Sequence, residues 1–334
     1  MKTAALHVLF IVSIIMCIGC ESKPKNQILS YPPIQATDTL KHQIFPTEEV
    51  FGSAMCMFIA DSLLIIEDYF NRDTSIWGIH LKSHHTAKAY IPKGRGPGEV
   101  SNPSSNIQCC PKTNSFLVYD PNYKKIITYN YRSDQFLEQK LPVQDKIFQE
   151  NFIQDIVRKD SMYICMGTGK LFAKNQRFLL TDNRFKYINH FEGYPEIAGI
   201  SEKDISEIYQ YGEEIHVKPD GSKLVFGSYI GGILEIFDLQ HLPDSIPLVR
   251  RHLYYMPIYE KDKIGNVYLT EGTIYGFENI DVTDQAIYTL VYEPYNPDII
   301  FPNKLVIYDW EGNWTKTYTL DCMVHALCVD ERSQ

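Results

Sequence analysis

The stretch Leu-Leu-Ile-Ile-Glu-Asp at residues 63–68 decides the fold, because its pattern returns four more times along a chain of 334 residues. Each copy is a short apolar, β-favouring run that ends in Asp and is followed by a polar turn and a second strand-like run. The other copies are residues 116–120, 178–182, 234–238 and 305–309. Repeats of this kind, with four strand signals each, are typical of the blades of a β-propeller.

The first repeat carries four strand-like runs with polar turns between them, at residues 55–60, 63–67, 76–81 and 87–91. Counting the first strand of every repeat gives starts near Met55, Asn106, Phe152, Glu214, Tyr275 and Met323, in steps of about 51, 46, 62, 61 and 48 residues. Six starts predict an all-β, six-bladed β-propeller, and we expect it to form one domain over residues 35–334.

Two places interrupt the pattern. Residues 201–209 combine a serine, early acidic residues and apolar positions at 205, 208 and 209, which predicts a short helical insertion near residues 200–210. The run at 323–329 reads as the opening strand of the sixth blade, but five residues follow it. We therefore expect an incomplete sixth blade, either truncated or a remnant, with residues 34–45 supplying an outer strand to the last blade.

The N-terminus resembles a bacterial lipoprotein signal with its lipobox. Lys2 is followed by an apolar run at residues 6–18, too short to span a bilayer comfortably, and then by Cys20. The resemblance implies a signal peptide over residues 1–19 and lipidation of Cys20. Residues 20–34 are polar and Pro-containing, so they are expected to form a flexible tether. A plain secretory signal with an incidental cysteine is the alternative.

The net charge of the chain argues against two classes of partner. The net charge is −9, and removal of Lys2 with the signal would make it −10, which argues against nucleic acid and against attraction to anionic lipid headgroups. Membrane association would then come from acyl chains. We expect a lipid-anchored protein of the cell envelope, on the periplasmic side or at the outer-membrane surface.

Apart from Cys17 and Cys20 the chain has six cysteines, and no two of them form a CxxC pair: Cys56, Cys109, Cys110, Cys165, Cys322 and Cys328. Most lie inside strand-like runs, where a free cysteine behaves as a small core residue. The pattern favours buried thiols over a disulfide framework.

Three segments together carry a family resemblance. They are Lys93-Gly-Arg-Gly-Pro-Gly-Glu99, the Pro-Asp-Gly-Ser-Lys turn at 219–223 with its Gly-Gly strand at 231–237, and Ile-Tyr-Asp-Trp-Glu-Gly-Asn at 307–313. In this order and spacing the chain resembles the TolB-like or NHL-like six-bladed propeller lipoproteins of Bacteroides-type bacteria. The resemblance implies a lipid-anchored propeller and leaves the mechanism open.

The glycine-rich segment is the first candidate binding site. Lys93, Arg95 and Glu99 could present charge at one propeller face, where an Arg fork can hold a carboxylate. The alternative is that the glycines solve a tight crossing between blades and that Arg95 pairs locally with Glu99.

Aromatic pairs form the second candidate. Tyr254 with Tyr255, and Tyr292 with Tyr295, could form a recognition surface at a rim, or could be ordinary packing between blades.

No catalytic motif is found, because HExxH, GxSxG, P-loop and dinucleotide patterns and Cys/His zinc spacings are all missing from the sequence. No cofactor is therefore predicted, and the leading hypothesis is a non-enzymatic binding or scaffold propeller with a protein, peptide or glycan ligand. The alternative is a metal-dependent hydrolase or lactonase with a divalent cation in the central channel. Three or more Asp, Glu or Asn side chains converging in the channel would favour the alternative.

Overall fold

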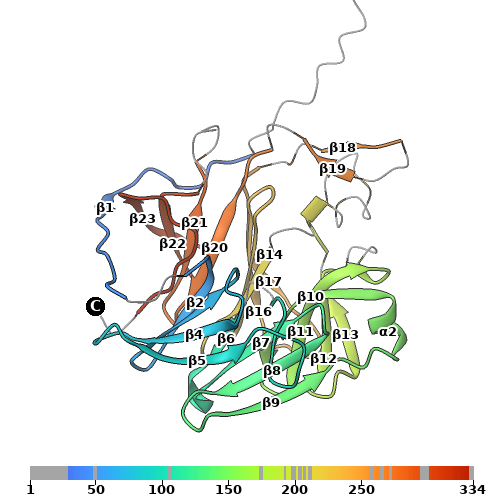
Figure 1. Ribbon diagram of the computed structural model, residues 1–334. Coiled ribbons are helices and arrows are strands. Elements are labelled where there is room, and N and C mark those ends of the chain that lie inside the picture. The colour runs from blue at the N-terminus through green and yellow to red at the C-terminus, as the bar shows by residue number, and fades with distance from the viewer. Residues whose placement is uncertain are drawn as a thin grey trace, which may run out of the picture.

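The computed structural model describes residues 29–47, 51–103, 107–172, 176–191, 193–196, 201, 205, 208–209, 213–255, 257, 259–263, 267–270, 273–293 and 301–330. In these residues, four four-stranded sheets and one five-stranded sheet stand as blades around a central channel (Figure 1). No helix in these described ranges is both long and apolar enough to cross a membrane. The predicted signal peptide, Cys20 and the part of the predicted tether up to residue 28 lie outside the described residues.

The blades follow one another along the chain, and each begins with its innermost strand. Blade 1 is β2 (Ala54–Ala60), β3 (Leu63–Asp68), β4 (Thr74–His80) and β5 (Thr86–Pro92). Blade 2 is β6 (Ile107–Cys110), β7 (Ser115–Asp120), β8 (Lys125–Asn130) and β9 (Gln135–Lys140). Blade 3 is β10 (Asn151–Lys159), β11 (Met162–Gly169), β12 (Phe178–Asp182) and β13 (Tyr187–Phe191). Blade 4 is β14 (Glu213–Val217), β15 (Lys223–Ser228), β16 (Ile233–Asp238) and β17 (Leu248–Leu253), and blade 5 is β20 (Phe277–Val282), β21 (Ala286–Val291), β22 (Lys304–Asp309) and β23 (Trp314–Leu320).

The aspartates of the recurring sequence motif end strands and hold turns, but they do not mark the same strand in every blade. Asp68 and Asp120 end the second strand of blades 1 and 2, whereas Asp182, Asp238 and Asp309 end the third strand of blades 3 to 5. The Asp309 carboxylate accepts the backbone N–H groups of Glu311 (2.9 Å) and Asn313 (2.8 Å). The motif therefore counts blades correctly, while its position within a blade shifts by one strand.

The N-terminal segment adds a fifth strand to blade 5. β1 (Asp38–Leu40) pairs in parallel with β23, with Asp38 opposite Tyr318 and Leu40 opposite Leu320. Figure 1 shows this blue strand beside the red outer strand of the blade. The expectation that residues 34–45 supply an outer strand is confirmed, and the blade that receives it is the last four-stranded one.

The C-terminal segment, residues 324–330, takes the place of the inner strand of a sixth blade, next to β20. The Leu327 N–H donates to Asn279 Oδ1 (2.9 Å), and the Val329 N–H donates to Asp281 Oδ2 (2.7 Å). On its other side, His325 Nε2 lies 3.1 Å from the Met55 sulfur of β2. The prediction of a strand at 323–329 is wrong, because side chains of blade 5 provide these bonds and no ladder forms.

Aromatic side chains fill the space between neighbouring blades, as the composition predicts. The Phe116 ring of blade 2 lies 5.6 Å from that of Phe58 and 6.0 Å from that of Tyr90 in blade 1, and stacks on Tyr129 at 5.5 Å. All four side chains are buried. Offset and edge-to-face contacts of this kind stabilise a core beyond the area they bury.

The remaining elements are insertions. The hairpin of β18 (Tyr259–Lys261) and β19 (Val267–Leu269) lies between blades 4 and 5 in the chain order. It projects from the ring (Figure 1). The helix α2 (Lys146–Gln149), capped by Asp145, and the 3-10 helix η1 (Pro111–Thr113) are single turns. Near residues 200–210, Ile205, Ile208 and Tyr209 are helical and buried.

Candidate functional site

The central channel contains a cavity of about 390 Å³, here called the channel cavity. All five inner strands line it, through residues such as Met57 of β2, Gln108 of β6 and Val157 of β10. It also touches the turns that follow inner strands, at Asp61, Pro111, Pro219 and Asp284, and Val329 of the C-terminal segment. The cavity therefore lies at the end of the channel where the inner strands finish.

The walls of the channel cavity combine apolar side chains with an excess of carboxylates. The apolar lining includes Phe58, Ile107, Val217 and Ile280, and the acidic lining is Asp61, Asp281, Asp284 and Asp330. His216 is the one side chain among the lining residues that can carry a positive charge near neutral pH. Two of these carboxylates have partners on the surface side: Asp61 Oδ2 accepts from Arg132 Nη2 (2.7 Å) and Asp284 Oδ1 accepts the Asp220 N–H (3.0 Å).

Asp281 and His216 form the electrostatic centre of the cavity. Burial raises the pKa of Asp281 to about 6, although the nearby His216 lowers it. Burial lowers the pKa of His216, but the Glu214 carboxylate 3.4 Å away outweighs this and leaves the pKa raised. A carboxyl and an imidazole whose pKa values are both raised therefore line the same cavity.

Glu214 of β14 ties blade 4 to blade 5. Its Oε2 accepts the Ile280 N–H (2.8 Å), and its Oε1 accepts from the Asn279 side-chain amide (3.1 Å). Asn279 in turn accepts from the C-terminal segment through its Oδ1. Glu214 and Asn279 thus link blade 4, blade 5 and the C-terminal segment through hydrogen bonds.

The described residues lining the cavity do not include a compact group of three His, Cys, Asp or Glu ligand atoms. Among the described residues, three His, Cys, Asp or Glu ligand atoms come within 4.8 Å of one another at His42, Asp321 and Cys322, outside the channel. Asp281 and Asn279 instead bond to the C-terminal segment. Four aspartates and Asn279 nevertheless line the cavity, so the acidic lining that the hydrolase hypothesis expects is present, whereas a compact group of three ligand atoms is not found there among the described residues.

The glycine-rich segment at 93–99 is a structured crossing from blade 1 to blade 2. Glu99 Oε2 accepts the Gly96 N–H (2.7 Å), so it does not pair with Arg95, whose guanidinium lies 5.9 Å from the Tyr123 ring centroid. Lys93 donates to the Tyr69 carbonyl oxygen. The expected Arg95–Glu99 pair is therefore replaced by a backbone contact, and Arg95 stays exposed beside an aromatic ring.

Beneath this crossing lies a buried ion pair. Lys125 Nζ donates to the Gly96 carbonyl (2.8 Å) and lies 3.2 Å from Glu138 Oε2, while the Gly98 N–H donates to the same carboxylate (2.9 Å). Gly98 has a φ of +73°, which favours glycine. The glycines of this segment therefore serve the structure of the crossing. Lys93 borders a shallow, open hollow together with Tyr69, Asn102 and Asn122.

The tyrosine pairs do not form an exposed recognition surface. Tyr254 and Tyr255 are buried between blades 4 and 5, where the Tyr254 and Tyr308 hydroxyls lie 2.7 Å apart. Tyr292 is also buried, and its hydroxyl donates to Glu278 Oε2 (2.7 Å). These rings are buried packing residues, so they do not form an exposed surface at a rim. Tyr295 lies outside the described residues.

The sequence analysis missed the polar lining of the channel, although a signal for it exists. Glu214 and His216 alternate along β14, and Asn279 and Asp281 alternate along β20. Residues two apart on a strand face the same side, so polar pairs on first strands indicate a channel-facing row. The six cysteines among the described residues are free thiols, of which Cys56 and Cys165 are buried.

Fold and cavity together define a β-propeller with a pocket in its central channel. The chain belongs to the family described as TolB-like 6-blade propeller-like, whose match covers residues 35–332. The described residues form five four-stranded blades, and the C-terminal segment occupies the position of a sixth inner strand.

Several solved structures are similar to this chain at low sequence identity. A protein from Bacteroides fragilis that is described as exported has a TM-score of 0.51 and 14% identity, with 88% of this chain and 75% of that chain covered. A member of the DUF4221 family from Bacteroides vulgatus has a TM-score of 0.49, 15% identity and coverage of 89% and 87%. The Cps50 (Swd1) propeller of Myceliophteria thermophila has a TM-score of 0.47, 12% identity and coverage of 82% and 89%. No curated protein matches the chain significantly.

Proposed function

We propose that the protein is a non-enzymatic binding propeller of the cell envelope, with a small organic ligand in the channel cavity. The observation that carries the proposal is the cavity itself, whose volume of about 390 Å³ lies in the range of small-molecule sites. Its apolar walls can bury a ligand, and a few placed polar groups can orient it.

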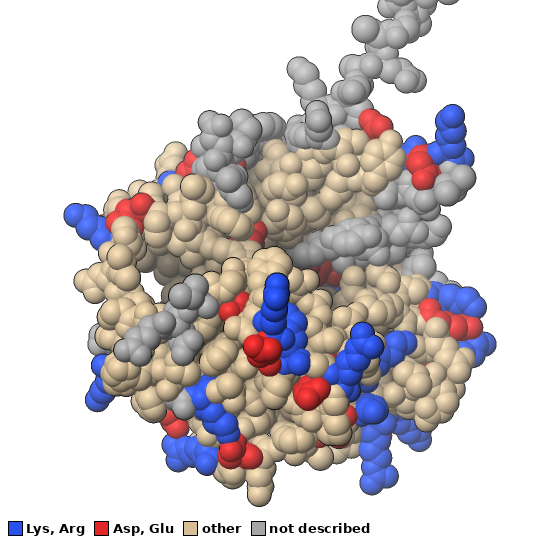
Figure 2. All heavy atoms as spheres, viewed as in Figure 1, with Lys and Arg blue, Asp and Glu red and all other residues tan. Residues whose placement is uncertain are grey.

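The charge of the lining indicates the class of ligand. Four aspartates line the cavity, and the one opposing cation is His216. A ligand with a positively charged or hydrogen-bond-donating group and an apolar body matches these walls. The reason is that an ionised carboxylate can accept hydrogen bonds but cannot donate them. Lys and Arg on the face shown in Figure 2 are interleaved with Asp and Glu, and this mixed charge supports a small ligand over a nucleic acid.

The binding proposal is tested with a panel of aliphatic and aromatic amines, each paired with its hydroxyl analogue of the same size. We expect amines to raise the melting temperature more than their neutral partners do. Asp330→Asn, which removes a charge from the cavity lining, should weaken the response, and Asp134→Asn on the outside of blade 2 should leave it unchanged. Equal responses to amines and alcohols would contradict the cationic ligand, and a panel without any binder would contradict the small-molecule site.

Anchoring is a separate part of the proposal. The lipobox-like sequence before Cys20 and the likeness to a protein described as exported support a lipid-anchored protein of the envelope. Cys20→Ala should release the protein from membranes or leave it unprocessed, as measured by fractionation and by the mass of the mature chain. A variant that is still processed and still sediments with membranes would refute the anchor. Which ligand class the cavity takes does not depend on this result.

A further inference from the structure

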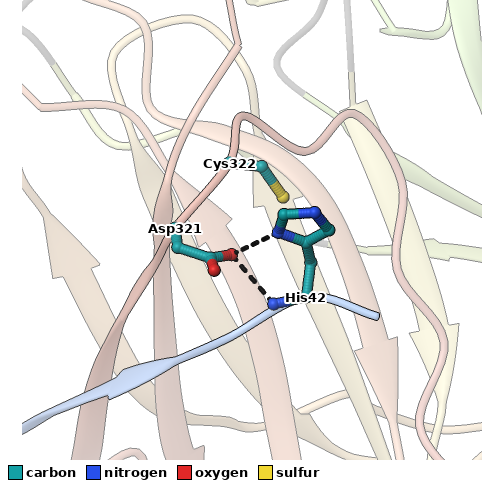
Figure 3. Close-up of side chains that lie close together, drawn as sticks. All are labelled: His42, Asp321 and Cys322. Atoms are coloured by element: carbon teal, nitrogen blue, oxygen red, sulfur yellow. Dashed lines mark hydrogen bonds and ion pairs between the residues drawn. The ribbon is translucent and has the colours of Figure 1, made fainter. Parts of the chain in front are cut away.

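A cluster of potential metal ligands lies where the N-terminal segment meets the end of blade 5. It consists of His42, just after β1, and of Asp321 and Cys322, just after β23. One ligand atom from each of the three side chains lies within 4.8 Å of the other two. Figure 3 shows the imidazole pointing toward the carboxylate and the thiol beside the ring.

The backbone holds these three residues in place. Asp321 Oδ1 accepts both the His42 N–H and His42 Nδ1 at 2.9 Å, and the Asp321 N–H donates to the Leu40 carbonyl (3.2 Å). On either side of the pair Asp321-Cys322, Leu320 and Val324 donate their N–H groups to the segment at 302–303. The corner that carries the carboxylate and the thiol is therefore fixed by bonds before and after it, as a preorganised site requires.

The donor set selects the metal. A thiolate, an imidazole nitrogen and a carboxylate oxygen together are ligands of Zn²⁺, whereas Mg²⁺ and Ca²⁺ take oxygen ligands only. Three protein ligands leave the fourth tetrahedral position to water, and all three residues are exposed, so water can reach it. Small side-chain movements suffice, because the three ligand atoms already lie within 4.8 Å of one another and ligand atoms on one zinc ion lie roughly 3–4 Å apart.

We propose that His42, Asp321 and Cys322 bind one Zn²⁺ ion that fastens the N-terminal segment to the end of blade 5. On binding, the Cys322 thiol loses its proton to solvent, and the proton on Nδ1 of the neutral His42 ring moves through solvent to Nε2, so that Zn²⁺ takes the place of the hydrogen bond between His42 Nδ1 and Asp321 Oδ1. His42 and Asp321 are 279 positions apart, so the ion joins the two ends of the ring. The free energy of binding then stabilises the fold, since the unfolded chain does not bring these ligands together.

The experiment uses the purified mature chain after removal of metal with a chelator. Zinc affinity and stoichiometry are measured by competition with a chromophoric indicator, and Co²⁺ serves as the spectroscopic probe. We expect one Zn²⁺ per chain, a rise in melting temperature with zinc, and a thiolate-to-cobalt charge-transfer band. Cys322→Ser should abolish the band, and Cys322→Ser and His42→Gln should each weaken zinc affinity by about 10-fold or more, because outer-shell changes alone cost about that much.

Two matched controls distinguish this site from incidental binding. His241 Nε2 lies 3.9 Å from Asp238 Oδ2 on the surface, so His241→Gln removes an exposed His–Asp pair elsewhere and should leave zinc affinity unchanged. Cys110→Ser removes a different thiol and should keep the cobalt band. The proposal fails if Cys322→Ser binds zinc within twofold of the unchanged chain, if its cobalt band persists, or if the unchanged chain takes up no zinc at equimolar metal.

Discussion

Replacement of Asp281 by Asn should stabilise the protein at alkaline pH, although it alters a hydrogen-bonded residue of the channel. Asp281 accepts the Val329 N–H, and the Asn side chain has an oxygen that can accept the same bond. What the change removes is the cost of a buried negative charge. That cost is visible in the pKa of Asp281, which burial raises from 3.8 to about 6.

The magnitude follows from that shift. A difference of about 2 pH units between the native and unfolded pKa corresponds to about 3 kcal/mol. Because Asp281 lines a cavity large enough for water, we reduce this to about 1–2 kcal/mol. Between pH 4 and pH 6 the native state binds a proton that the unfolded state has released, so the unchanged chain loses stability as pH rises through this window. The gain from Asp281→Asn should therefore be near zero at about pH 4 and complete at about pH 8.

The assay is urea denaturation of the unchanged protein and of Asp281→Asn at about pH 4 and pH 8, with unfolding followed by circular dichroism. The dependence of the unfolding free energy on urea concentration is compared between the two, to confirm that both expose the same surface on unfolding. Asp284→Asn is the matched control, since it lines the same cavity but is exposed, and it should change stability by no more than about 0.5 kcal/mol. A loss of stability at pH 8, or the same gain at both pH values, would show that the Asp281 charge is not costly and would refute the reasoning.

Three further predictions concern the blades. Phe116→Ala, in the aromatic cluster between blades 1 and 2, should lower the free energy of unfolding by about 3–5 kcal/mol, whereas Phe70→Ala at an exposed ring should cost far less; equal losses would contradict the packing described. Gly98→Ala should cost about 1–2 kcal/mol through its positive φ, as measured by denaturant unfolding, and a neutral result would argue against that backbone shape. Lys125→Ala should cost about 3 kcal/mol by leaving Glu138 without its cation, and Lys125→Met with Glu138→Leu should recover most of that loss; a double variant as unstable as the single one would exclude the ion pair as the cause.

Local sequence patterns were enough to predict the all-β class and the positions of the strands. Apolar runs that end in Asp predict strands because β-branched and aromatic residues fit a pleated sheet and a carboxylate caps the turn that follows. The four runs of the first repeat correspond to β2 to β5 within two residues at each end. The family resemblance rested on the same turns, and the match over residues 35–332 confirms it.

The closure of the ring and the lining of its channel were decided by tertiary structure. The run at 323–329 has the composition of a strand, yet no described strand pairs with it through a backbone ladder, and Leu327 and Val329 bond instead to the side chains of Asn279 and Asp281. Tyr254 and Tyr255 read equally well as packing or as a rim, and only the approach of blade 5 buries them. The amino-acid sequence by itself determined where strands and turns form, because those preferences act between near neighbours. Which strands meet, and which side chains then face the channel or contact His42, depends on residues hundreds of positions apart and is set by the packing of the whole ring.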